Sequence, residues 1–372
     1  MSTTDYLFPV RLNRRAFLKS AGTTAAALAL PSLAGAKEKT PAVRIGSGKW
    51  TYELDESWGK LAEGMSYGFG CGIVCDSKDH IYVTSRSQNP CVAIFDRKGA
   101  LLETWSKPFA DALGYSVPQV ADTAHCIYWS LEGKEEFLYF TENVSTNKEG
   151  AKLGKRVVKT DLNGKILYEI GNVAKVTSVA QKFEWTNPTD VAVAANGDIY
   201  VVDGYGSQRV SRFDRNFKHL KTIGERTEKG QTGPDAKHGT FNTCHGVWIN
   251  TLRKNEPEVY IADRHNSRIE VYDLELVYKR TISGDFVRNP CCFYQHKGHI
   301  YIPDLGSMVV ILDAKDQPVA VLGDGKGVKK EEFEKGHPDK FTTPHALTVD
   351  SKGDLYVLEW VPYGRVRKFR KV

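Results

Sequence analysis

Three histidines occupy equivalent places in a repeated unit of this 372-residue chain, and imidazole is a common metal ligand. They are His125, His245 and His345, and each opens an apolar, strand-like segment. The unit recurs between them without a histidine. The six strand-opening positions, here named the first ring, are Cys71, His125, Thr189, His245, Cys291 and His345. Three imidazoles that converge on one point are a common way to hold catalytic zinc with one position left open.

The histidine pattern has two interpretations. If the repeats close into a ring, the histidines lie about 120° apart around one axis and can converge on a zinc ion. Alternatively, they are polar side chains in a hydrated channel. We favour the metal site. Cys71 and Cys291 lie at alternate positions of the first ring, where either could touch the metal or stay buried. The seven cysteines leave at least one unpaired, and the sequence does not assign partners.

A second set of residues follows the second strand of each repeat. Arginine offers a carboxylate a fixed fork of donors. A nearby cation favours the deprotonated form of a phenol, so a tyrosine here is a candidate base. Both residue types are expected at the same mouth of the funnel as the histidines. The second strand of each repeat carries a tyrosine at the same place. The residues four positions after these tyrosines are Arg86, Asn143, Gly204, Arg264, Leu305 and Trp360, and Tyr205 directly follows Gly204.

The elements that must position these residues are β-strands. Each repeat contains an apolar strand, a turn, an Ile-Tyr-Val-like strand, and then two further strands. Four strands in a period of roughly 40–60 residues indicate a β-propeller. The sequence therefore predicts an all-β, six-bladed propeller over residues 37–372. The last repeat lacks a fourth strand, and Lys49–Leu54 can supply it, which would close the ring.

Residues 1–36 are expected to be an export signal outside the fold. Arg14 and Arg15 form a twin-arginine pattern before a short apolar stretch, with a cleavage site near Ala36. Removing four basic residues and one acid lowers the formal charge from +6 to about +3. A net charge of this size does not indicate nucleic-acid binding. We also predict no membrane span in the mature chain. We expect an exported, periplasmic monomer.

The chain resembles the lyase domain of peptidylglycine amidating enzymes, a six-bladed propeller of the NHL-repeat class. The resemblance covers most of the mature chain and is densest from Asn187 to Phe369. The matching strings include Asp203-Gly204-Tyr205, Cys244-His245-Gly246, Ala262-Asp263-Arg264-His265-Asn266-Ser267-Arg268-Ile269 and Pro344-His345-Ala346.

The resemblance implies a carbon–nitrogen lyase that splits a peptidyl-α-hydroxyglycine into an amide and glyoxylate. It implies zinc on His125, His245 and His345, and Tyr205 as the catalytic base. Arg264 and Arg86 would hold the substrate carboxylate or developing negative charge.

The chain also departs from the family pattern. Where the family has an acidic residue tied to a structural calcium, this chain has Ala346, so calcium is not expected at that position. A family cysteine is replaced by Gly206, which removes that disulfide. Two rival hypotheses remain: a non-enzymatic NHL propeller that binds protein or glycan, and a different metal-dependent lyase or hydrolase acting on a small hydroxy acid.

Overall fold

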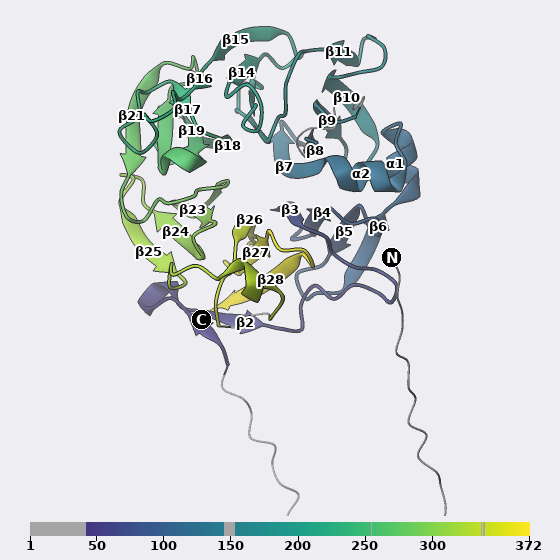
Figure 1. Cartoon of the computed structure of the whole chain (residues 1–372). Coiled ribbons are helices and arrows are strands. Elements are labelled where there is room, and N and C mark those ends of the chain that lie inside the picture. Colours follow the sequence, from purple (N-terminus) through teal and green to yellow (C-terminus); the bar gives the residue numbers. More distant parts are fainter. Residues whose placement is uncertain (1–41, 145–152, 254, 336, 338) are drawn as a thin grey trace, which may run out of the picture. The chain divides into compact units, whose positions relative to one another are not determined.

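The computed structural model describes residues 42–372 except 145–152, 254, 336 and 338, and these residues form one compact unit. The export signal predicted for residues 1–36 lies outside the described residues. Six four- or five-stranded β-sheets follow one another around a central axis, as Figure 1 shows. The six-bladed propeller predicted from the repeats is confirmed.

The first three blades follow one another along the chain, each with its first strand nearest the axis. Blade 1 contains β3 (Gly70–Cys75), β4 (Ile81–Ser85), β5 (Val92–Phe95) and β6 (Leu101–Trp105). Blade 2 contains β7 (Ala124–Glu132), β8 (Glu135–Glu142), β9 (Arg156–Thr160) and β10 (Ile166–Gly171), with β11 (Ala180–Lys182) added in parallel. Blade 3 contains β12 (Asp190–Val193), β13 (Ile199–Val202), β14 (Val210–Phe213) and β15 (His219–Ile223).

The remaining blades repeat this order. Blade 4 contains β18 (Cys244–Asn250), β19 (Glu258–Asp263), β20 (Arg268–Tyr272) and β21 (Tyr278–Ser283). A two-stranded pair, β16 (Glu225–Arg226) and β17 (Thr240–Phe241), precedes it. Blade 5 contains β22 (Tyr294–His296), β23 (His299–Asp304), β24 (Met308–Leu312) and β25 (Pro318–Leu322). Blade 6 contains β26 (Pro344–Val349), β27 (Leu355–Glu359) and β28 (Arg365–Lys371).

An N-terminal strand completes blade 6. β2 (Tyr52–Asp55) pairs antiparallel with β28, and β1 (Arg44–Ile45) extends the sheet. The sequence predicted this strand over Lys49–Leu54, and its start needs correction. Gly48–Trp50 forms a 3₁₀ turn, η1, because Gly48 has a φ of +54° and its carbonyl accepts hydrogen bonds from Thr51. The strand therefore begins only at Tyr52.

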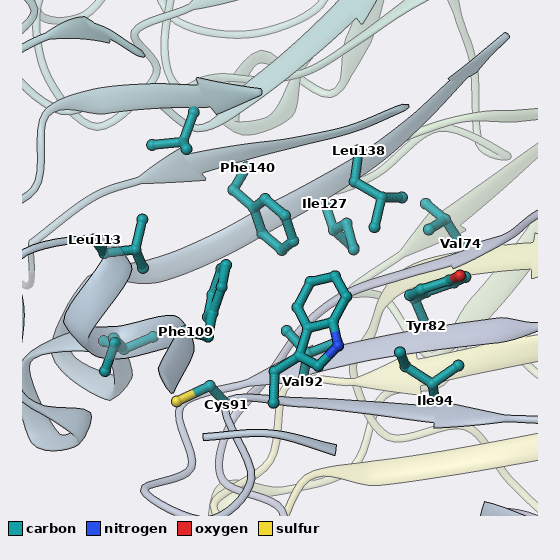
Figure 2. Packing of buried hydrophobic residues seen from close by; sticks show 14 residues of the cluster. Val74, Tyr82, Cys91, Val92, Ile94, Phe109, Leu113, Ile127, Leu138 and Phe140 are labelled. Carbon is teal, nitrogen blue, oxygen red and sulfur yellow. The ribbon is translucent and has the colours of Figure 1, made fainter. Parts of the chain in front are cut away.

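The core lies between neighbouring blades. The tyrosine shared by the second strands is buried in every blade, and several of these hydroxyls bond to a neighbouring blade, as Tyr200 does with the Leu274 carbonyl at 2.7 Å. Two short helices, α1 (Lys107–Ala112) and α2 (Val117–Thr123), enlarge the cluster between blades 1 and 2. Figure 2 shows Phe109 of α1 beside Phe140, with ring centroids 5.5 Å apart. Among the described residues, no helix is long and apolar enough to cross a bilayer.

The six tyrosines named here as the shared set are Tyr82, Tyr139, Tyr200, Tyr260, Tyr301 and Tyr356.

α2 also has a direct consequence for the site, because it ends at Thr123, two residues before the first histidine. A capping box between Ser116 and Gln119 fixes the start of α2. The helix therefore delivers the chain into β7 in a defined direction.

Candidate metal centre

The three histidines all lie at irregular points in the innermost strands. In β7, β18 and β26 the pairing with the second strand shifts by one residue at His125, His245 and His345, respectively. The same shift occurs at Cys71 in β3. A β-bulge leaves one residue unpaired and redirects its side chain. The repeated bulge therefore turns equivalent side chains out of their blades and toward the axis.

The three imidazoles converge at the axis, as the sequence predicted. All three side chains are buried, and one nitrogen from each lies within 4.8 Å of the others. The Nε2 atoms of His125 and His245 are 3.2 Å apart. The ring centroids are separated by 4.9 to 5.4 Å. This spacing suits one small ion between the three rings.

Backbone carbonyls fix which nitrogen of each ring faces the axis. The Nδ1 atoms of His125, His245 and His345 lie 2.6, 2.8 and 2.8 Å from carbonyl oxygens. Because a carbonyl oxygen only accepts, each Nδ1 must carry the hydrogen and donate it. Each Nε2 then presents a lone pair to the axis, the arrangement that metal-binding histidines commonly have. The three accepting carbonyls belong to the other first-ring residues, Thr189, Cys291 and Cys71.

The chemistry of these three Nε2 atoms fits a metal cation. Two lone pairs facing each other at 3.2 Å repel, and the buried Nε2 of His345 has no hydrogen-bond partner among the described residues. A cation bound to all three would satisfy them together. Burial lowers the pKa of His125 and His245 well below the ordinary value and that of His345 to about 3. Neutral imidazole, the form that binds metal, is therefore favoured at neutral pH.

The two first-ring cysteines do not join this group. Cys71 Sγ lies 3.2 Å from the Ala124 carbonyl, and Arg264 Nη1 donates to Cys291 Sγ at 3.7 Å. Burial raises the pKa of Cys71 to about 12 and that of Cys291 to about 11, so both stay protonated thiols. All seven cysteines of the chain are free thiols in the structure.

The residues after the second strands form a second ring at one side of the histidines. Each backbone N–H donates to the carbonyl of the residue two positions before a first-ring residue, at 2.9 to 3.3 Å. By this criterion the third member is Tyr205 rather than Gly204, which corrects the count from the sequence. Gly204 passes so close to the neighbouring blade that an added Cβ would lie 2.1 Å from the Cys244 carbonyl oxygen. From here on the second ring is Arg86, Asn143, Tyr205, Arg264, Leu305 and Trp360.

Tyr205 and Arg264 lie together on one flank of the histidines. The Arg264 guanidinium donates from Nη2 to the Tyr205 Oη at 2.6 Å. The Tyr205 ring centroid is 5.4 Å from those of both His125 and His245. Arg264 is buried and begins the 3₁₀ turn η2 (Arg264–Asn266), which fixes its direction. This flank therefore presents a phenol oxygen, held by a cation, beside two of the three imidazoles.

Arg86 lies on a different flank from Arg264. Its Nη2 donates to Asn143 Oδ1 at 2.5 Å, and its guanidinium lies 5.3 Å from the Trp360 ring centroid. The Trp360 ring is in turn 5.1 Å from the His345 ring. The structure thus brings Arg86, Arg264 and Tyr205 to the histidines, as the sequence predicted, but separates the two arginines. Within the described part of the chain, neither arginine forms an ion pair.

A small cavity lies beside the histidines, among residues that follow them along the innermost strands. Its volume is about 50 Å³, enough for a few water molecules. The lining is mostly apolar, with one carboxyl group, that of Asp190, which the sequence analysis did not single out. The cavity is bordered by the three histidines and by residues such as Ile127, Trp129, Trp248, Tyr294 and Leu347.

Asp190 ties together the strands that carry two of the histidines. Its Oδ1 accepts from the Cys126 thiol at 2.7 Å and from its neighbour's backbone N–H, and its Oδ2 accepts from the Val247 N–H at 3.0 Å. Cys126 follows His125, and Val247 lies two residues after His245. Burial raises the pKa of Asp190 to about 7.

We compare the free energy of unfolding of the metal-free wild type with that of an Asp190→Asn variant. The wild-type value minus the variant value should decrease as pH rises from 5 to 8. A carboxyl group whose pKa is raised by folding stabilises the folded state at low pH, and this contribution is lost as pH rises through about 7. Asparagine does not titrate, whereas the histidines titrate alike in both proteins. Denaturant unfolding in chelator at both pH values measures the effect. A difference that stays constant with pH would contradict it.

Comparisons with known proteins agree with this class of fold. The family model for the NHL repeat matches residues 186–213, which contain most of blade 3. A solved structure described as a streptogramin B lyase has a TM-score of 0.53 and 12% identity, covering 87% of this chain and 99% of that chain. At this identity the likeness concerns the fold alone. The chain is a six-bladed β-propeller that contains an NHL repeat at residues 186–213 and a buried three-histidine cluster.

Among curated proteins, two kinds of relative are similar to this chain. Human NHL repeat-containing protein 3 is 28% identical over 325 residues, which are 84% of this chain and 82% of that protein. A probable peptidyl-alpha-hydroxyglycine alpha-amidating lyase of Caenorhabditis elegans is 25% identical over 207 residues, 53% of each chain. The peptidyl-alpha-hydroxyglycine alpha-amidating lyase 1 of Drosophila melanogaster is 26% identical over 210 residues, 50% of this chain and 35% of that protein. The chain therefore resembles the amidating lyases, as its motifs indicated.

Proposed function

We propose that this protein is a zinc-dependent carbon–nitrogen lyase that cleaves a carboxylated α-hydroxy amide into an amide and glyoxylate. One observation carries the proposal: three buried imidazoles with inward-facing Nε2 atoms lie beside a phenol–guanidinium pair and a second guanidinium. His125, His245 and His345 would hold the metal. Zinc is the metal of choice because three-nitrogen sites with one open position are typical of catalytic zinc. When bound, it supplies Lewis acidity toward a substrate oxygen.

Tyr205 is the proposed base. Its Oη receives a hydrogen bond from Arg264 Nη2, which can stabilise negative charge on that oxygen. In the proposed reaction Oη starts as the phenolate and takes the proton of the substrate hydroxyl, the carbon–oxygen bond becomes a carbonyl, and the carbon–nitrogen bond breaks. The electron pair of that bond remains on nitrogen, which receives the proton back from Tyr205. The products are the amide and glyoxylate, and no water is consumed.

The two arginines take different parts in this scheme. Arg264 stabilises the Tyr205 oxygen, because its Nη2 already donates a hydrogen bond to that oxygen. Arg86 donates from Nη2 to a neutral amide oxygen and forms no ion pair among the described residues, so its charge remains for the substrate carboxylate. We therefore propose that Arg86 anchors the carboxylate and Arg264 stabilises the negative charge that develops near Tyr205.

The test is the zinc-loaded protein with α-hydroxyhippurate as substrate. We expect glyoxylate and benzamide in equal amounts, loss of activity in chelator and recovery with zinc. Absence of products from the zinc-loaded protein would reject the amidating reaction. A small hydroxy acid that is turned over instead would support the different metal-dependent lyase. A metal-free protein that binds a protein or glycan would support the binding propeller.

We also propose that the protein is exported in folded form to the periplasm. The proposal rests on Arg14 and Arg15 in the sequence. We expect a mature N-terminus at or near Lys37 by mass spectrometry, and retention of uncleaved protein in the cytoplasm when both arginines are replaced by lysine. Wild-type protein with an intact N-terminus in the cytoplasm would contradict the export signal.

A further inference from the structure

Asn143 is a buried second-ring residue to which no role has yet been given. It lies at the end of β8, and its backbone N–H donates to the Thr123 carbonyl at 2.9 Å. Only 1% of its surface is exposed. Asn143 directly follows β8, as Arg264 directly follows β19, and this places it at the same mouth as Tyr205 and Arg264. Asn143 therefore belongs to the wall of the candidate site rather than to a blade interior.

The contact with Arg86 fixes the orientation of the Asn143 amide. A guanidinium has only donors, so the amide atom 2.5 Å from Arg86 Nη2 must be the oxygen. The NH₂ group then points away from that contact. Its nitrogen, Nδ2, is buried and has no hydrogen-bond partner in the part of the chain that the structure describes. Leaving a buried donor without a partner is unfavourable, so such a group in a site wall is suited to a ligand.

Three of the buried donors that lack a partner among the described residues lie on the second ring. Besides Asn143 Nδ2, the buried Nε atoms of Arg86 and Arg264 have no partner. Arg86 and Asn143 lie on the same flank, beside Trp360 and the His345 ring. This flank combines one uncompensated positive charge with at least two free N–H donors. Such a combination matches the two oxygens of a carboxylate.

Because Asn143 is an amide and not a carboxylate, the positive charge of Arg86 on this flank is not neutralised. An aspartate there would pair with Arg86 and cancel its charge. The neutral Asn143 oxygen orients the same guanidinium and leaves its charge available, while the NH₂ group adds a donor. An acidic residue would be isosteric but would repel an anionic ligand.

We propose that Asn143 is a substrate-binding residue that, together with Arg86, binds the carboxylate of the substrate and selects for it. The proposal rests on the proposed lyase function and identifies the carboxylate pocket within it. Trp360 forms the wall between this pocket and His345. In this arrangement the carboxylate lies on the Arg86 flank and the hydroxyl lies toward Tyr205.

The test is equilibrium binding of hippurate and of hippurate methyl ester to the zinc-loaded full chain by calorimetry. Hippurate has the carboxylate but no α-hydroxyl, so it is not turned over. We expect wild type to prefer hippurate over the ester. Asn143→Asp should weaken hippurate binding by about tenfold or more and change ester binding by less than about twofold, because only the charged ligand is repelled.

Two further variants keep the result interpretable. Asn143→Ser removes the amide donor without adding charge and should also weaken hippurate selectively, which covers the case in which Asn143→Asp does not fold. Asn250→Asp is the matched control, because Asn250 is equally buried, at 1% exposure, at the opposite end of β18. It should leave the preference for hippurate unchanged.

The outcomes separate this proposal from the lyase proposal. If wild type shows no preference for hippurate, or if both Asn143 variants bind it like wild type, the carboxylate pocket is wrong, even when glyoxylate is released. If binding depends on Asn143 but α-hydroxyhippurate is not cleaved, the pocket stands and the lyase function falls.

Discussion

Replacing Tyr205 by phenylalanine should lower turnover of the α-hydroxy amide by about 10²–10⁴-fold, the usual cost of removing a general base. The phenol oxygen is bonded to Arg264 and the phenol ring packs against the His125 and His245 rings, so the geometry places a proton acceptor in contact with the metal ligands. The remaining ring keeps its packing against the two imidazoles. We therefore expect unchanged metal content and an unchanged unfolding temperature.

The control for this substitution is Tyr278→Phe. Tyr278 is half-buried in β21 and its hydroxyl contacts Thr281, away from the histidines. It should keep wild-type turnover. The measurement is kcat with zinc-loaded protein. A Tyr205→Phe enzyme as active as wild type would reject the proposed base while leaving the metal centre intact.

Replacing His245 by alanine should remove the metal and reduce turnover to the level of metal-free protein. The His245 ring centroid is 4.9 Å from those of both other ligands, and the loss of this ring leaves two of the three nitrogens of the cluster facing the axis. Catalytic zinc sites generally have three protein ligands, so we expect affinity for zinc to fall by more than about 100-fold.

Elemental analysis after dialysis against limiting zinc measures this effect. His219→Ala serves as the control, because His219 lies exposed on β15. We expect about one zinc per chain in wild type and in the control. Full zinc content in His245→Ala would show that the histidines are not the ligands and that the metal is held elsewhere.

The position of the histidines could be predicted because the repeat has a strict internal register. Each histidine opens the innermost strand of its blade, and innermost strands face one axis in any closed propeller. The sequence could not show that a β-bulge at His125, His245 and His345 is what turns the rings inward. It also could not show the carbonyl partners, because these come from other blades.

Other features depend on contacts that the repeat pattern does not contain. Counting four residues from the shared tyrosine of blade 3 gave Gly204. In the structure Gly204 lies against the Cys244 carbonyl, and the next residue, Tyr205, makes the backbone hydrogen bond that defines the second ring. The helices α1 and α2 are an insertion between blades 1 and 2, outside the strand periodicity. The carboxyl of Asp190 is notable only once blades 2, 3 and 4 meet around it.

The most direct test of the metal centre is a crystal structure of the zinc-loaded protein with diffraction recorded on both sides of the zinc absorption edge. We predict one anomalous peak per chain, about 2.0–2.1 Å from the Nε2 atoms of His125, His245 and His345. The Nδ1 atoms should keep their carbonyl partners. A peak bound by other residues, or no peak among the three imidazoles at saturating zinc, would contradict the account.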